Sequence, residues 1–274
     1  MKDIGSVLSR ADLSMVKTEP FPHIVIENAI DENLADTLLY EYPPLDVITE
    51  GKDKKSNRRF SLGARKVEES NKISPLWKDF IARHVSEDFF HEFCTSFEKE
   101  VQEKYPDILR EKPLSEFVPG VRNSDTFSDK DVLLDAQICV NTPVLKEKSV
   151  VRGPHIDIHD KLYAGLFYLR HPEDSSEGGD LLIYKWKEDP LFFDEQYTYE
   201  ELVEPVATIP YKHNTLILFL NSLNSLHGVT ARYPTRYPRL FMNLVGEVPQ
   251  PLFSTKMYEK EERGMMSKLK SLFS

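Results

Sequence analysis

The second half of the chain is a series of short apolar segments separated by turn sequences, and this feature limits the possible folds most strongly. The intervening stretches are rich in glycine, proline, asparagine and serine, which favour turns and positive φ. Many short strands at close spacing are typical of a β-sandwich or a jelly-roll barrel. The predicted strands are residues 136–140, 162–169, 181–184, 206–209, 215–220 and 240–245.

The first half of the chain has a different pattern. A β-branched core in residues 22–27 predicts one strand, and Asp31 is the expected N-cap of a helix that runs to Tyr42. Apolar and aromatic side chains recur at steps of three and four in residues 74–105, which predicts helices that bury one face in the core. Residues 49–59 are polar and basic, typical of a solvated loop, with a lid over a site as the alternative.

Together these patterns predict an α+β fold with a mainly β core. We expect a β-sandwich or a jelly-roll barrel, with N-terminal helices packed on its outside. Residues 1–130 are expected to be a mixed, mostly helical region on the barrel, and residues 131–250 the β core, within one structural domain. Residues 251–274 are expected to be an amphipathic tail that docks on the body or joins two subunits in a homo-oligomer.

Composition narrows the functional classes. Of 274 residues, 45 are acidic and 35 basic, and the net charge of −10 disfavours nucleic acid and anionic lipid as partners. The longest apolar run, Thr215–Leu220, is far too short to span a membrane, and Met1 opens no signal peptide, so we expect a cytoplasmic protein. Only Cys94 and Cys139 carry thiols, and we expect both to be reduced and packed in the interior.

A candidate metal site follows from the spacing of His155 and Asp157. They are two residues apart, so their side chains lie on the same face of an extended segment. His227 follows a predicted strand and its turn, 72 residues after His155 (227 − 155). Two imidazoles and one carboxylate on one face of a metal leave positions open, as in non-haem Fe(II) oxygenases. His159 also shares a face with Asp157, so spacing alone leaves that pair as an alternative.

A candidate anion site lies shortly after His227. Arg232, Arg236 and Arg239 are clustered there, and Arg239 opens the last predicted strand. A guanidinium binds a carboxylate through two parallel hydrogen bonds, so at least one of them is expected to anchor an acidic ligand. The alternative interpretation is that they solvate a proline-rich loop.

These residues resemble the Fe(II)/2-oxoglutarate-dependent dioxygenases, in particular their prolyl-hydroxylase-like branch. The resemblance covers residues 134–247 and implies a double-stranded β-helix of the jelly-roll or cupin-like kind, with residues 131–250 as its catalytic core. It consists of His155-Ile-Asp157, Leu166-Phe-Tyr-Leu169, Gly178-Gly-Asp-Leu-Leu-Ile-Tyr184, Asn214-Thr-Leu-Ile-Leu-Phe-Leu220, and His227-Gly-Val with the arginines and the last strand.

The resemblance implies roles for individual residues. His155, Asp157 and His227 would hold Fe(II), and 2-oxoglutarate would chelate the metal through its keto acid end. Matching the family's spacing favours Arg236 as the anchor of the far carboxylate. Arg239 is preferred slightly, because it enters the final strand and shares a face with Phe241 and Asn243. Tyr168 resembles a family position that helps to bind this carboxylate, and Asn141 aligns loosely with a strand position that contacts the cosubstrate.

The implied reaction uses O₂ to convert 2-oxoglutarate to succinate and CO₂ while a substrate is hydroxylated. A small molecule or sugar is the first expectation for the substrate, and a protein side chain is the second. Specificity would come from the N-terminal helices and residues 49–59, 113–130 and 190–199. Arginines at 58, 59, 122 and 152 are candidates for recognising an acidic small molecule, or else solvate the surface.

Two other functional classes stay open. A cupin-like module would bind a metal or ligand without turnover and would not need a cosubstrate arginine. A zinc hydrolase would use the same three ligands, but no carboxylate beside the motif obviously serves as a general base.

Overall fold

A large β-sheet forms the centre of the computed structural model, which describes residues 4–52, 55–109, 112–188 and 192–256. The sheet runs in the order β1-β8-β5-β10-β4-β2, with β3 beside β4; every neighbouring pair is antiparallel except β3 and β4. The strands are β1 (His23–Glu27), β2 (Arg59–Leu62), β3 (Pro119–Val121), β4 (Val132–Asn141), β5 (Lys161–Tyr168), β8 (Thr215–Leu220) and β10 (Arg239–Glu247).

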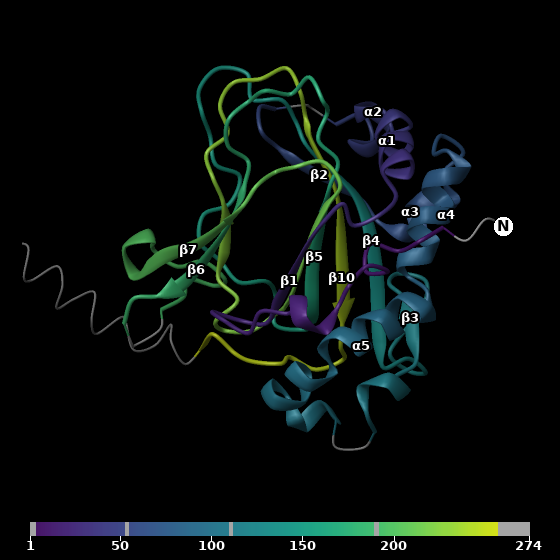
Figure 1. The fold of residues 1–274 in the computed structure, drawn as a ribbon, viewed down its shortest axis with the longest axis vertical. Helices are drawn as coiled ribbons and strands as arrows, with labels where there is room; N and C mark the ends of the chain where they lie inside the picture. The colour runs from purple at the N-terminus through teal and green to yellow at the C-terminus, as the bar shows by residue number, and fades with distance from the viewer. Residues whose placement is uncertain (1–3, 53–54, 110–111, 189–191, 257–274) are drawn as a thin grey trace, which may run out of the picture.

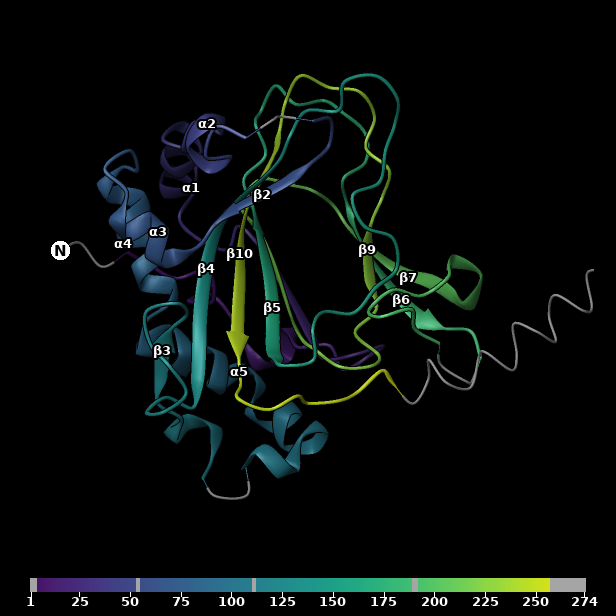
Figure 2. The same cartoon turned by 180° about the vertical axis from the view of Figure 1, so that it is seen from behind.

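A smaller sheet faces one side of the large one (Figures 1 and 2). Its order is β7-β6-β9, formed by β6 (Leu181–Trp186), β7 (Val203–Ile209) and β9 (His227–Val229). The chain alternates between the sheets, since β5, β8 and β10 belong to the large sheet while β6, β7 and β9 belong to the small one. This alternation is the topology of a double-stranded β-helix, so the predicted fold class is confirmed.

The helices cover the outer face of the large sheet (Figure 1). Asp31 caps α1 as predicted by accepting a hydrogen bond from the Leu34 amide, although the helix ends at Tyr40 rather than Tyr42. The predicted helical layer forms two helices, which meet where Ser86 caps the second. The α-helices are α1 (Glu32–Tyr40), α2 (Leu45–Ile48), α3 (Ala64–Glu69), α4 (Pro75–His84) and α5 (Glu87–Lys104). Short 3-10 turns occupy Leu13–Met15, Pro106–Leu109, Leu114–Glu116 and Glu200–Leu202.

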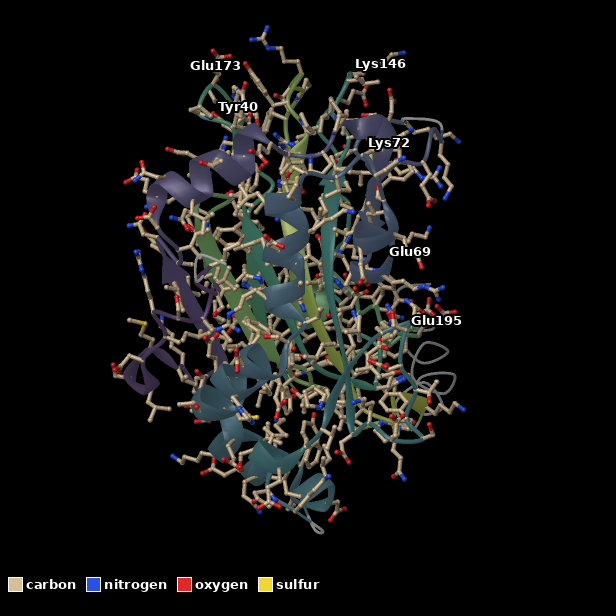
Figure 3. All side chains as sticks on the ribbon, turned by 90° about the vertical axis from the view of Figure 1, so that its right-hand side faces the viewer. Tyr40, Glu69, Lys72, Lys146, Glu173 and Glu195 are labelled. Carbon is tan, nitrogen blue, oxygen red and sulfur yellow. The ribbon has the colours of Figure 1, made fainter. Side chains whose placement is uncertain are left out.

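The aromatic stripe of α4 and α5 packs against β5. The Phe93 and Tyr163 rings lie 4.3 Å apart, and the Phe80 and Phe167 rings lie 6.0 Å apart. All four side chains are fully buried, so the stripe is core, as expected. Figure 3 shows the helices in front of the sheet, with the 91% exposed side chain of Tyr40 at the periphery.

β2, β3 and β9 are strands that sequence patterns did not predict. β2 pairs with β4 and extends the large sheet, and it begins at Arg59, the last residue of the polar stretch interpreted as a solvated loop. Arg59 and Ser61 face the interior of the barrel, where they line a cavity. The four residues of β2 alternate polar and apolar, but so short a run directly after a basic stretch is a weak signal for a strand.

Several other expectations can be compared with the structure. Cys94 and Cys139 are free and buried, as expected. No helix in the part of the chain that the structure describes is long and apolar enough to cross a membrane. The division into residues 1–130, 131–250 and 251–274 stays a prediction. Most of the expected tail, from residue 257 onward, lies outside the described residues.

Candidate metal and cosubstrate site

The backbone holds His155 and His227 directly opposite each other. Each residue's amide donates to the other's carbonyl oxygen, with both N···O distances 2.9 Å. In this antiparallel bridge the two imidazole rings have centroids 4.2 Å apart. The register therefore brings together two side chains that are far apart in sequence.

Both imidazoles have the orientation that a metal ligand requires. The Nδ1–H of His155 donates to the Gly153 carbonyl (2.8 Å), and that of His227 donates to the Ser225 carbonyl (2.9 Å). These bonds fix the tautomer in which each Nε2 is unprotonated, as a metal ligand requires. In this structure the Nε2 of His155 accepts from the Nη1 of Arg152 at 3.2 Å, a contact that a bound metal would replace. Burial is the main cause that lowers the pKa of both histidines, so both rings are neutral.

Asp157 completes a compact set of ligand atoms with the two histidines. One ligand atom from each of the three residues lies within 4.8 Å of the others, and all three side chains are buried. Burial by itself raises the pKa of Asp157, but Lys161, the two imidazoles and Arg152 together lower it below its usual range. Two neutral imidazoles and one carboxylate form a donor set that fits a divalent transition metal such as Fe(II).

The three residues line a cavity of about 300 Å³ between the two sheets. Its wall contains apolar side chains from β5, β8 and β10, and polar side chains from β2, β4 and β10. The lining includes Arg59, Arg122, Gln137, Asn141, Arg152, Lys161, Ala164, Leu166, Phe219, Arg239, Phe241, Asn243 and Glu247.

Arg239 is a buried cation in the same cavity. Its side chain is 3% exposed, and its Nε donates to the carbonyl oxygen of Gly179 at 2.7 Å. Its guanidinium carbon lies 4.8 Å from the centre of the Tyr168 ring, which sits just behind the cavity wall. Burial raises the pKa of Tyr168, so its hydroxyl is neutral and can donate a hydrogen bond.

Three buried polar atoms around Arg239 have no hydrogen-bond partner among the described residues. They are the Nη2 of Arg239, the hydroxyl of Tyr168 and the Oδ1 of Asn141. Arg239 and Asn141 are directly opposite in the pairing of β10 with β4. Because buried polar groups are nearly always satisfied, this cluster fits a polar ligand that supplies the missing partners.

A glycine turn positions the carbonyl that orients Arg239. Gly178 and Gly179 have φ angles of +79° and +85°, a backbone region that residues other than glycine rarely adopt. A Cβ at Gly178 would lie 1.9 Å from the carbonyl oxygen of Ala231. Only glycine therefore allows this turn to pack against the segment before β10, where it supports the Arg239 guanidinium.

Comparisons with known proteins found similarity only to solved structures. No family model matches the sequence, and no curated protein matches it. This chain is similar to solved prolyl hydroxylases. A prolyl 4-hydroxylase structure from Phytophthora capsici has 15% identity and a TM-score of 0.45, over 83% of this chain and 59% of that chain. This chain thus spans less than two thirds of that protein.

Two further structures are similar at comparable levels. A Pseudomonas putida prolyl-4-hydroxylase has 10% identity and a TM-score of 0.45, over 86% of this chain and 98% of that chain. The epimerase SnoN, solved with Fe³⁺, alpha ketoglutarate and nogalamycin RO, has 12% identity and a TM-score of 0.47, over 82% of this chain and 78% of that chain. At such identities the detailed site must be argued from this chain's own residues.

Other residues considered from the sequence lie outside the cavity. The Arg236 side chain is 80% exposed and pairs with Glu173 at 3.6 Å, and it does not line the cavity. Arg232 is buried, but its Nη2 is bound to Asp174 at 2.7 Å. The His159 ring packs on Phe253, with its Nε2 3.4 Å from the Thr255 hydroxyl, and it does not join the cluster of three ligands.

Sequence reasoning missed several polar residues of the cavity. Gln137, Lys161 and Glu247 line it without belonging to any recognised motif. The two-residue period of the last strand was the available signal, because it extends from Arg239 through Asn243 to Glu247. Lys161 and Gln137 lie on the neighbouring strands β5 and β4, and strand pairing cannot be derived from a single sequence.

Proposed function

We propose that this protein is an Fe(II)- and 2-oxoglutarate-dependent oxygenase that hydroxylates a small molecule. The observation that carries the proposal is that one cavity contains both a buried His155–Asp157–His227 cluster and a buried, incompletely paired Arg239. A module that only binds a metal has no use for the second feature. A sugar-like substrate and a protein side chain remain alternatives within the same reaction.

In this proposal, each part of the cavity has a defined task. His155, Asp157 and His227 would hold Fe(II) through their Nε2 and carboxylate oxygen atoms. Arg239 would bind the far carboxylate of 2-oxoglutarate, the Tyr168 hydroxyl would donate to it, and Asn141 would donate through its side-chain amide nitrogen. With O₂, the bound iron and keto acid supply oxidative decarboxylation to succinate and CO₂ and the transfer of one oxygen atom to a substrate C–H bond.

The apolar part of the cavity separates these polar groups from water. Ala164, Leu166 and Phe219 line it on β5 and β8, and the Phe219 ring lies 4.7 Å from the His227 ring. An environment that excludes water strengthens the ion pair of Arg239 with a carboxylate and limits side reactions of an oxidant. Arg239 donates to Gly179, so its guanidinium is already oriented before the cosubstrate binds.

An anaerobic titration tests the proposal directly. The protein is mixed with Fe(II) and then with 2-oxoglutarate, and the weak visible absorption of the metal–keto acid chelate is followed. We expect the band in the unmodified protein, no band in His155→Ala, and a band in Arg239→Ala only at higher 2-oxoglutarate. Arg236→Ala is the matched control and should titrate like the unmodified protein, because its side chain is at the surface.

The outcomes of this titration separate the functional classes. A folded protein that binds the metal but gives no band with 2-oxoglutarate would refute the oxygenase and favour a cupin-like binding module. An unchanged titration of Arg239→Ala, together with a weakened one of Arg236→Ala, would refute only the anchor assignment. A positive result justifies screening candidate substrates by the release of succinate.

A further inference from the structure

Glu247 is a buried carboxylate at the opposite end of the cavity from Arg239. Alternate residues of β10 line this cavity from Arg239 through Phe241, Asn243 and Val245 to Glu247. Glu247 is 7% exposed, and its Oε2 accepts from the Nε of Arg122 at 2.8 Å. Its Oε1 is buried and has no hydrogen-bond partner among the described residues.

The charges around Glu247 leave an excess of carboxylates. Asp160 and Asp135 act on Glu247 as like charges, against the cations Arg122 and Lys161. The Nζ of Lys161 lies 3.2 Å from Asp157, and the Nη1 of Arg122 lies 3.7 Å from Asp135. Both cations are thus already shared with other carboxylates. Burial is the main cause that raises the pKa of Glu247, which means that an added cation would relieve an unfavourable charge.

Two side-chain amides connect this end to the rest of the cavity. Asn243 Nδ2 lies 3.2 Å from Gln137 Oε1, and the Nε2 of Gln137 donates to Asp135 at 2.7 Å. This end therefore combines the Glu247 carboxylate and two side-chain amides with the cations Arg122 and Lys161. At the other end, no carboxylate of the described residues is paired with Arg239. Lys161 is paired in register with Glu247 and contacts Asp157, so the carboxylate end adjoins the ligand cluster.

From this arrangement we infer that Glu247 is a substrate-recognition residue and that the substrate carries a primary ammonium group, which donates to Glu247 Oε1. The inference rests on the proposed oxygenase, because a substrate presupposes that enzyme. It gives the second polar end of the same cavity a role in binding the substrate. An ammonium group at this end offsets the charges of Glu247, Asp135 and Asp160. The cavity also contains Arg59, Arg122, Arg152, Lys161 and Arg239, so a negative charge on the same substrate would lie against those cations and away from Glu247.

The test uses three probes of equal length, n-butylammonium, n-butanol and butyrate. Their binding to the protein is measured by saturation-transfer NMR and by shifts of the backbone amides of residues 243–247. We expect n-butylammonium to bind about tenfold more tightly than n-butanol, because hydrogen bonds to charged groups are the stronger ones. Equal binding of these two probes, or a preference for butyrate, would overturn the inference.

Variants assign the effect to Glu247. Glu247→Gln should weaken n-butylammonium binding about tenfold and leave n-butanol unchanged. Glu204→Gln on β7 is the control, because this exposed glutamate pairs with Lys185 outside the cavity and should have no effect. Arg122→Gln should act in the opposite direction and tighten n-butylammonium binding, since it removes the cation that neutralises Glu247. If Glu247→Gln does not fold, Arg122→Gln still decides, and an unchanged affinity there refutes the inference.

The probe experiment and the iron titration fail independently. Ammonium binding that depends on Glu247, without a chelate band, would refute the proposed oxygenase and retain the cavity as an amine-binding site. A chelate band without Glu247-dependent ammonium binding would leave the oxygenase and refute the inference. Repeating the probe titration in the presence of 2-oxoglutarate should not displace n-butylammonium, because the two ligands are assigned to opposite ends of β10.

Discussion

The Cα atom of Gly228 faces the carbonyl group of Gly153 across the bridge between His155 and His227. A Cβ built on Gly228 would lie 3.1 Å from the Gly153 carbonyl oxygen and 3.2 Å from the Tyr184 ring. This is the same carbonyl that receives the Nδ1–H of His155. Gly228, which is not itself a ligand, thus constrains the position of the carbonyl group that orients the His155 ring.

We predict that Gly228→Ala weakens metal binding about tenfold, the lower end of what changes behind a metal ligand cost. The methyl group must displace the Gly153 backbone by a few tenths of an ångström, which rotates the His155 ring. Anaerobic titration with Co(II) measures the affinity. Gly153→Ala is the matched control, because a Cβ there meets no atom within 4 Å. Equal affinities of the two variants would contradict the prediction.

Tyr168→Phe should affect cosubstrate binding and stability in opposite directions. Its hydroxyl is buried without a partner among the residues placed by the structure, so its removal should leave the free protein equally stable or about 1 kcal/mol more stable. The same change should weaken 2-oxoglutarate binding about three- to tenfold, because one hydrogen bond to the carboxylate is lost. Thermal unfolding without ligand and calorimetric titration with 2-oxoglutarate measure the two effects.

The control for Tyr168→Phe is Tyr237→Phe. The Tyr237 hydroxyl donates to Glu173 at the surface at 2.6 Å, and its loss should change neither quantity by much. A Tyr168→Phe protein that is clearly destabilised while binding 2-oxoglutarate normally would show that the hydroxyl has a structural partner instead of a ligand.

The sequence predicted the strands well where one or both faces are apolar. β8 is predicted with its observed bounds, and β5 and β10 are found within one or two residues of their observed ends. β2 was missed although Phe60 and Leu62 alternate with Arg59 and Ser61, because the strand has only four residues and directly follows a basic stretch. An alternation of four residues is at the lower limit of what indicates a strand.

The candidate site divides in the same way. The spacing of His155 and Asp157 is local, so the two-residue period of a strand could place them together. The partnership of Arg239 with Asn141 and Tyr168 depends on the order β5-β10-β4, which no local pattern contains. For the same reason Glu247 was visible only as the last residue of a strand. Its charged neighbours Arg122 and Lys161 come from other parts of the chain.

Asp174→Asn should destabilise the protein by about 3–5 kcal/mol, the usual cost of breaking a buried ion pair from one side. Asp174 is 5% exposed and binds the Nη2 of Arg232, which is 1% exposed, at 2.7 Å. The asparagine would leave the buried guanidinium without its counter-charge. Urea unfolding measures the free energy. The neighbouring Glu173→Gln is the control, because its ion pair with Arg236 is exposed and should contribute less than about 1 kcal/mol. Similar losses in both variants would refute this account.

The protein should become less stable as the pH falls below 6.5, because the buried His84 ring resists protonation in the folded state. The ring is fully buried between α4 and the N-terminal segment, its Nδ1–H donates to the Phe80 carbonyl, and its Nε2 accepts from the Val7 amide at 3.0 Å. Burial lowers the pKa of His84 from 6.5 to about 3, and the nearby charge of Arg83 acts in the same direction. Protonation of Nε2 would also turn the acceptor of the Val7 amide into a donor.

The sign follows from which state binds the proton. Between pH 6.5 and about 3, the unfolded chain protonates His84 while the folded protein keeps it neutral, so unfolding takes up a proton. The contribution of His84 to the free energy of unfolding should therefore be fully present above pH 6.5. Below pH 6.5 this contribution should fall by about 1.4 kcal/mol per pH unit. Urea unfolding at pH 7.5, 6 and 5 of the unmodified protein and of His84→Gln measures the difference in slope. Other buried histidines contribute equally to both proteins, so parallel pH profiles would show that His84 does not titrate in this way.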